Sequence, residues 1–212
     1  MDSVRTSKKV QTGTSMIEVL VTLIILMLGL LGIAGLQLRA HQAELESYQR
    51  AQALILLQDM VDRLNANRKV AVCYAFTTTP ASGNPFLGTP SPAADYADPA
   101  ALACSAGTSA QQTMALADLA AWDQSLQGAS ETAGGANTGA VIGARGCIAL
   151  EDAANQVYRI SVSWQGRVST IDPAASDPVL GANTVLTCGS GNYGDETMRR
   201  IVSTTVRIGV LS

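Results

Sequence analysis

The pattern of apolar and polar residues along the chain predicts a long helix followed by a region of strands. Residues 19–36 contain no charged side chain, and Thr22 is their one polar side chain. A helix of this length covers about 27 Å, close to the roughly 30 Å of hydrocarbon that a spanning helix must cross. We therefore expect the first half of the helix, residues 14–37, to be transmembrane. Glu18 lies at the edge of this segment, where an ionisable group costs about 1 to 3 kcal/mol and normally has a partner.

The helix is predicted to continue after the apolar segment, since residues 38–67 contain no glycine or proline. Apolar residues recur there at intervals of three and four, which places them on one face of a helix. They are Leu54, Leu57, Val61 and Leu64, with Gln58, Asp59, Asp62 and Arg63 around them. We expect a single helix from about residue 15 to 67, apolar on all sides in its first half and amphipathic in its second.

After residue 67 the sequence predicts a stretch with little regular structure, followed by several strands. Residues 68–146 form a connector in which prolines and glycines prevent a long helix or strand, apart from a short helix at about 109–127. Trp122 in this helix is interpreted as a core residue. Apolar and polar residues alternate in 157–165, as in a half-buried strand. Further strands are expected at 147–152, 183–188 and 199–209.

These elements predict an α+β fold, in which one long N-terminal helix packs on an antiparallel sheet formed by residues 147–212. The chain has 212 residues, 47% of them hydrophobic, and a formal net charge of −3, which fits one membrane helix and one head of ordinary size. Arg5, Lys8 and Lys9 precede the apolar segment and predict a cytoplasmic N-terminus. The head is then extracytoplasmic, and its acidic balance gives no reason to expect nucleic-acid binding.

Four cysteines lie in the part predicted to be extracytoplasmic, where disulfides form: Cys73, Cys104, Cys147 and Cys188. Three pairings are possible. We favour Cys73 with Cys104 and Cys147 with Cys188, because each pair encloses a loop-rich stretch near regular elements. A zinc site is the alternative, but the sequence has no Cys-x-x-Cys and only one histidine, so we expect no metal.

Candidate catalytic residues are few, and we expect neither an enzyme nor a bound cofactor. His41 is the only histidine, and it lies on the predicted long helix without a cysteine or metal-ligand neighbour. We interpret four carboxylates of the head as solvated loop charges, namely Asp95, Asp98, Glu151 and Asp152. We interpret three further charged residues as surface charges or a subunit contact, namely Glu196, Arg199 and Arg200.

The residues at the start of the apolar segment carry a resemblance to a known family. Gly13 is followed by one residue and then by Ser15-Met16-Ile17-Glu18-Val19-Leu20-Val21, which resembles the class III signal of type IV pilins and pseudopilins. In that family a prepilin peptidase cuts after the glycine and methylates the new N-terminus. The resemblance implies that residues 1–13 are a cleaved leader and that Thr14, where the family usually has phenylalanine or methionine, becomes the N-methylated first residue. It also implies that Glu18 pairs with the N-terminus of a neighbouring subunit. The alternative is an ordinary signal anchor with Glu18 at the interface.

The last third resembles the PilV group of minor pilins of type IVa systems, on Tyr158 to Gly166 and on short pieces such as Cys188-Gly189 and Arg199-Arg200. This resemblance implies a minor subunit that takes part in the initiation, or priming, of pilus assembly and in a tip complex. The implied partners are other minor pilins, the major pilin, the prepilin peptidase, the inner-membrane assembly platform and a tip adhesin. The implied location is the inner membrane, with one span and a periplasmic head, and then the pilus. The alternatives are a minor pseudopilin of a type II secretion system and a membrane-anchored binding protein that does not polymerise.

Gly29, Gly32 and Gly35 interrupt the apolar segment at intervals of three. Each costs about 1 kcal/mol relative to alanine inside a helix, so the helix should bend or extend most easily here. One hypothesis is a local extension when the subunit moves from bilayer to filament. The other is close packing of helices through small residues in the membrane.

Overall fold

The structure is a computed structural model, and it describes Gly13 and residues 15–89, 95–129, 132–137, 139, 141–173 and 186–209. Residues 1–12 of the predicted leader and Thr14 lie outside the described residues. The chain divides into two compact units, one ending at Glu44 and one beginning at Leu45. Helix α1, Met16–Ala66, confirms the predicted long helix and contributes to both units.

In the second unit, α1 buries one narrow face, made of Gln49, Ala53, Leu57, Met60 and Leu64. The predicted apolar face is partly wrong, because Leu54 is 48% exposed and Val61 is only partly buried. The predicted face and the buried face both contain Leu57 and Leu64, and the buried face is rotated about the helix axis relative to the predicted one. The prediction followed the large apolar residues and overlooked Ala53, which is fully buried.

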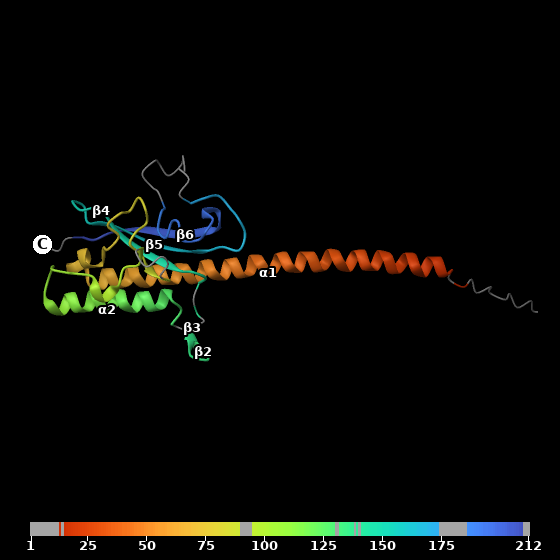
Figure 1. Ribbon diagram of the computed structural model, residues 1–212, viewed down its shortest axis with the longest axis horizontal. Helices are drawn as coiled ribbons and strands as arrows, with labels where there is room; N and C mark the ends of the chain where they lie inside the picture. Colours follow the sequence, from red (N-terminus) through yellow and green to blue (C-terminus); the bar gives the residue numbers. More distant parts are fainter. Residues whose placement is uncertain are drawn as a thin grey trace, which may run out of the picture. The chain divides into compact units, whose positions relative to one another are not determined.

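Four strands form one antiparallel sheet in the order β1-β4-β5-β6, and Figure 1 labels the last three of them. They are β1 Leu87–Gly88, β4 Arg145–Asp152, β5 Val157–Gln165 and β6 Arg199–Arg207. The predicted strands at 147–152, 157–165 and 199–209 correspond to the last three, so the α+β fold is confirmed. Of the predicted strand at 183–188, residues 183–185 lie outside the described residues, and residues 186–188 are not in a strand.

One face of the sheet shares a core with α1 and with helix α2, Ser109–Leu126. Helix α2 begins with a capping box, in which Thr108 and Gln111 each accept a backbone N–H of the other. Trp122 is fully buried and donates its indole N–H to the carbonyl of Leu56 at 2.9 Å, which confirms it as a core residue. A Cβ at Gly146 on β4 would lie 2.3 Å from the Trp122 ring, so only glycine fits beneath it.

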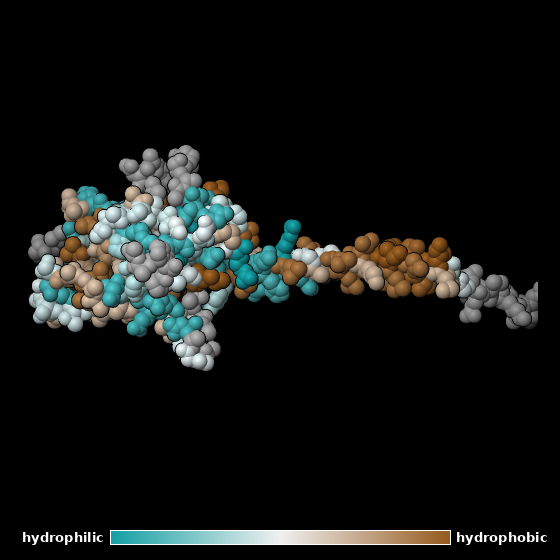
Figure 2. Space-filling view, in the orientation of Figure 1, coloured by the Kyte–Doolittle hydropathy of each residue, from teal (hydrophilic) through white to brown (hydrophobic). Residues whose placement is uncertain are grey.

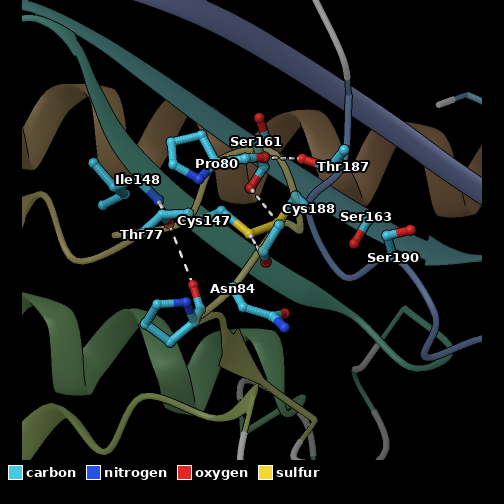
Figure 3. The surroundings of a disulfide bond; sticks show 12 residues. Thr77, Pro80, Asn84, Cys147, Ile148, Ser161, Ser163, Thr187, Cys188 and Ser190 are labelled. Atoms are coloured by element: carbon cyan, nitrogen blue, oxygen red, sulfur yellow. Dashed lines mark hydrogen bonds between the residues drawn. A yellow bond between two sulfur atoms is a disulfide. The ribbon is translucent and has the colours of Figure 1, made fainter.

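The opposite face of the sheet is also covered, although the alternation predicted a half-buried strand. Ser161 and Ser163 on β5 are 4% and 0% exposed. Figure 3 shows both serines near the disulfide between Cys147 and Cys188, which belongs to a second small core. The hydroxyl of Ser163 also lies 2.9 Å from that of Tyr193. The half-buried prediction is therefore wrong at Ser161 and Ser163, where loops rather than solvent meet the side chains, whereas Gln165 at the end of β5 is exposed as predicted.

Short elements lie between the main ones in the head. They are η1 Arg68–Tyr74, η3 Pro99–Ala101, η4 Glu196–Met198 and the paired strands β2 Thr132–Ala133 and β3 Ala136–Asn137. Tyr74 and Phe86 in the connector are fully buried. The connector therefore supplies part of the core, in addition to linking the long helix to the sheet.

Candidate assembly site

Glu18 lies in the first turn of α1. The carbonyl of Ser15 accepts the backbone N–H of Glu18 at 2.9 Å and that of Val19 at 3.3 Å, which begins the helix. The Glu18 side chain is exposed, and no described residue donates a hydrogen bond to its carboxylate. The helix dipole favours a negative charge in this turn by about 0.3 to 1 kcal/mol, which is less than the cost of placing it at a membrane edge. The carboxylate is thus available for a cation from another molecule.

Residues 19–36 of α1 are apolar apart from Thr22, and the face of the helix seen in Figure 2 is hydrophobic along this part. The helix is long and apolar enough to cross a membrane, and none of its most apolar window is buried in the described chain. Leu28 and Leu36, for example, are 65% and 70% exposed. Thr22 donates its hydroxyl to the carbonyl of Val19 at 2.8 Å, so its polar group is satisfied within the helix. Such a surface needs a cover of lipid or of other helices.

Gly29, Gly32 and Gly35 are all helical, and apart from the adjacent residues and the backbone of the helix itself, no described atom lies within 4 Å of the position that a Cβ would take at any of them. Contacts within the described chain therefore do not require glycine at these positions. A requirement can come from a close neighbour or from the bending of the helix itself. Both hypotheses stay open as predictions about the assembled or membrane-bound state.

The comparison with known families concerns the part of the chain that begins in the apolar half of α1. Residues 35–123 match the family model described as Tt1218-like, type IV pilin Tt1218. Over these residues, which are less than half of the chain, the protein is similar to type IV pilins. The matched residues run through the second half of α1 and the connector into α2, but include neither Glu18 nor the strands β4 to β6. No curated protein and no solved structure matches the chain significantly.

All four cysteines of the chain lie in disulfides. Cys73 is bonded to Cys104, with Cα atoms 5.2 Å apart, and Cys147 to Cys188, with Cα atoms 5.8 Å apart. The first disulfide joins η1 to the segment before α2, and the second joins β4 to the loop before η4. The pairing is the one favoured from the sequence, and it leaves no cysteine thiolate to bind a metal.

Arg199 and Arg200 are not surface charges, in contrast to the expectation. Arg199 is fully buried and donates its Nε–H to Glu196 at 2.6 Å. Arg200 is 14% exposed and donates its Nε–H to Glu46 of α1 at 2.7 Å. Adjacent residues of a strand point to opposite faces, so the two guanidinium groups serve different layers of the head. Sequence reasoning missed the second pair because its members are 154 positions apart.

The acidic pairs considered as catalytic candidates each have structural partners. Asp95 accepts a hydrogen bond from the side chain of Asn84, Asp98 from the backbone of Ala100, and Glu151 from Arg159. Asp152 accepts hydrogen bonds from the side chain and the backbone N–H of Asn155, which lower the pKa of its carboxyl. These carboxylates hold turns and strand ends in place.

A polar cluster joins the end of α1 to η1 and α2. The Tyr74 hydroxyl donates to Asp118 at 2.6 Å, and Arg63 donates to the other oxygen of the same carboxylate at 3.0 Å. Burial, together with the hydrogen bond to Asp118, raises the pKa of the Tyr74 phenol well above its ordinary value of 10. Burial likewise raises the pKa of Tyr193, on the other side of the sheet. The head therefore depends on neutral phenols in both layers.

Proposed function

We propose that this protein is a minor subunit of a type IV pilus and takes part in the initiation of pilus assembly, within a priming or tip complex. The observation that carries the proposal is the exposed, apolar surface of the first half of α1, with the carboxylate of Glu18 at its start, to which no described residue donates a hydrogen bond. A helix of this kind is stable in a bilayer and in a bundle of similar helices. The minor role rests on the resemblance of residues 147–212 to the PilV group.

The assembly step proposed for Glu18 begins with removal of the leader. Cleavage between Gly13 and Thr14 creates an α-amino group, and N-methylation of Thr14 leaves its charge in place. At about 4 Å and an effective dielectric constant of about 20, two opposite unit charges attract by about 4 kcal/mol. This exceeds the cost of about 1 to 3 kcal/mol of holding Glu18 at the apolar edge. A neighbouring subunit that supplies the amine is therefore held in a defined axial position.

The proposed location and partners follow from this step. The N-terminus is cytoplasmic and the head periplasmic before assembly, and the subunit then enters the pilus. The prepilin peptidase and the inner-membrane assembly platform act on α1, whereas other minor pilins, the major pilin and a tip adhesin meet the assembled subunit. The subunit has a structural rather than an enzymatic role.

The first test is the intact mass of the protein extracted from its native membrane. The expected mass is that of a chain beginning at Thr14 with one added methyl group. A chain that begins at Met1, or that is cut elsewhere, contradicts the proposal and favours a membrane-anchored binding protein.

The second test compares Glu18→Ala with Thr22→Ala, which removes a hydroxyl from the same helix without removing a charge. We expect Glu18→Ala to be processed normally but to fall roughly tenfold in sheared filaments, the effect of about 1.4 kcal/mol. Thr22→Ala should be incorporated at the parental level. Normal incorporation of Glu18→Ala contradicts the pairing. Crosslinks from the head that recover only secretion-system subunits would favour the pseudopilin alternative.

A further inference from the structure

Strand β6 forms one edge of the head's sheet. It pairs with β5 along its full length, from Arg199 to Arg207, and with no other strand among the described residues. Nine residues is long for an edge strand, and proteins usually protect such edges with charge, proline, a bulge or a covering segment. The register of β6 shows which of its backbone groups are unpaired.

Backbone hydrogen bonds at both ends of the β5–β6 pair give the same register. Ile208 donates its N–H to Gln156 at 3.0 Å, and Gly166 donates its N–H to Met198 at 2.7 Å. In an antiparallel pair, residues that bond the partner alternate with residues whose N–H and C=O point away. The even-numbered residues of β6 therefore bond β5, and the odd-numbered residues face outward.

Four residues of β6 consequently direct their backbone groups away from the sheet: Ile201, Ser203, Thr205 and Arg207. The N–H of Arg199 is excluded because it bonds to the carbonyl of Glu196. No hydrogen bond of the described chain uses the N–H or C=O groups of the four residues. Four donors and four acceptors thus form a regular row along the edge.

The side chains of β6 suit the addition of a strand. Residues 201–206 are uncharged and are mostly β-branched, which favours extended pairing. Val202 and Val206 pack against the main core and are only partly buried. Part of their apolar surface is therefore exposed beside the unpaired backbone groups of β6. Arg207 is exposed at the far end, and β6 contains no acidic residue.

We propose that β6 accepts an extended segment of another protein as a fifth strand of the sheet, paired through Ile201, Ser203, Thr205 and Arg207. The segment carries apolar side chains on the face of Val202 and Val206 and an acidic residue near Arg207. The proposal depends on the sheet alone and goes beyond the assembly step at Glu18. Such β-strand addition draws its affinity from main-chain hydrogen bonds and its specificity from alternate side chains.

A second copy of β6 does not fit this description. An antiparallel pair of two β6 edges centred on Ser203 brings the Arg207 end of each copy to the Arg199 end of the other. The arginines at the start of β6 already pair with Glu196 and Glu46, and β6 contains no acidic residue, so a second copy supplies no carboxylate to Arg207. A different chain with an acidic residue at this position is therefore favoured.

The test uses the full chain, isotope-labelled in detergent micelles, and a short peptide of alternating valine and threonine with aspartate at both ends. Without peptide, the amides of Ser203 and Thr205 should exchange with solvent rapidly, whereas those of Val202 and Thr204 are protected. With the peptide at about 1 mM, exchange at Ser203 and Thr205 should slow by about tenfold. Protection of Ser203 and Thr205 without peptide, or no change at this concentration, overturns the proposal.

Matched variants locate the contact. Thr205→Pro removes an N–H that points outward, and it should weaken peptide binding by about tenfold or more, whereas Thr205→Ala keeps the N–H and should bind within about twofold. If Thr205→Pro does not fold, Arg207→Glu replaces it, and its negative charge should weaken binding by about threefold or more. Equal binding by the folded variant and Thr205→Ala contradicts the proposed row of hydrogen bonds.

Discussion

Removal of the guanidinium of Arg200 should destabilise the head by separating α1 from β6. The group donates to Glu46 of α1 and to Thr170, both at 2.7 Å, and to the carbonyls of Thr197 at 3.1 Å and Val168 at 2.5 Å. Arg200→Met keeps most of the apolar stem and removes every one of these bonds. Three parts of the head then lose their common donor: α1, η4 and the segment after β5.

The size of the effect depends on how far water replaces the lost bonds. Glu46 is 31% exposed, so the pair with Arg200 is worth close to the 0.2 to 1 kcal/mol of a surface salt bridge. The carbonyl of Val168 and the hydroxyl of Thr170 are in exposed positions and regain water, which leaves about 0.5 to 1 kcal/mol for each remaining bond. We expect Arg200→Met to lower the free energy of unfolding by about 2 to 3 kcal/mol.

Urea unfolding of the full chain in detergent, followed by tryptophan fluorescence, measures this change. The chain has two tryptophans, and both Trp122 and Trp164 are buried in the head. A double-mutant cycle with Glu46→Gln should give a coupling energy of about 0.5 to 1 kcal/mol. Arg207→Met is the control and should change stability by less than about 0.5 kcal/mol. A loss below about 1 kcal/mol for Arg200→Met, or no coupling to Glu46, refutes the reasoning.

Three further predictions concern the same head. Trp122→Ala should lower the free energy of unfolding by about 3 to 5 kcal/mol in urea, because the side chain is fully buried. Replacing both Cys147 and Cys188 by serine should cost about 3 to 4 kcal/mol, because the disulfide joins residues 41 positions apart. Stability should fall as the pH rises above about 10, since the raised pKa values of Tyr74 and Tyr193 let the unfolded state lose protons first. Urea midpoints at about pH 9 and pH 11 measure this last effect.

A specific result would contradict each of these three predictions. A loss below about 1 kcal/mol for the alanine variant contradicts the placement of the indole in the core, and the same loss for the serine variant contradicts the effect assigned to the disulfide. The stabilisation by the neutral phenols is complete below about pH 10 and disappears as the pH increases. A urea midpoint that stays constant across this range shows that the phenols titrate as they do in the unfolded chain.

The elements with a strong period were predictable from the sequence, and the contacts between distant segments were not. The long apolar run, the alternation at 157–165 and the spacing around Trp122 each report a local environment. The face of α1 was misjudged because Ala53 carries little hydrophobic signal, although it is fully buried in the head. The burial of Ser161 depends on loops that approach the sheet from far along the chain, and no local pattern reports them.

In the candidate assembly site and the head, too, the features set by neighbouring residues were predictable, and those set by distant segments were not. Glu18 was identified by its position, because a charge beside a membrane-length apolar run is rare enough to stand out. The β6 edge was missed, since a strand pattern does not show whether one or two neighbours flank it. The pairing of Arg200 with Glu46 was missed as well, because charge patterns reveal partners only within a helical turn or across a hairpin.

The disulfide between Cys147 and Cys188 has a consequence for the order of events in the cell. It links β4 covalently to the loop that contains Cys188. This loop belongs to a layer over one side of the sheet that consists largely of loops and has only a small apolar core. In a reducing compartment this layer would be held to β4 by noncovalent contacts alone. With the head in the proposed periplasmic location, the covalent link would form only after export.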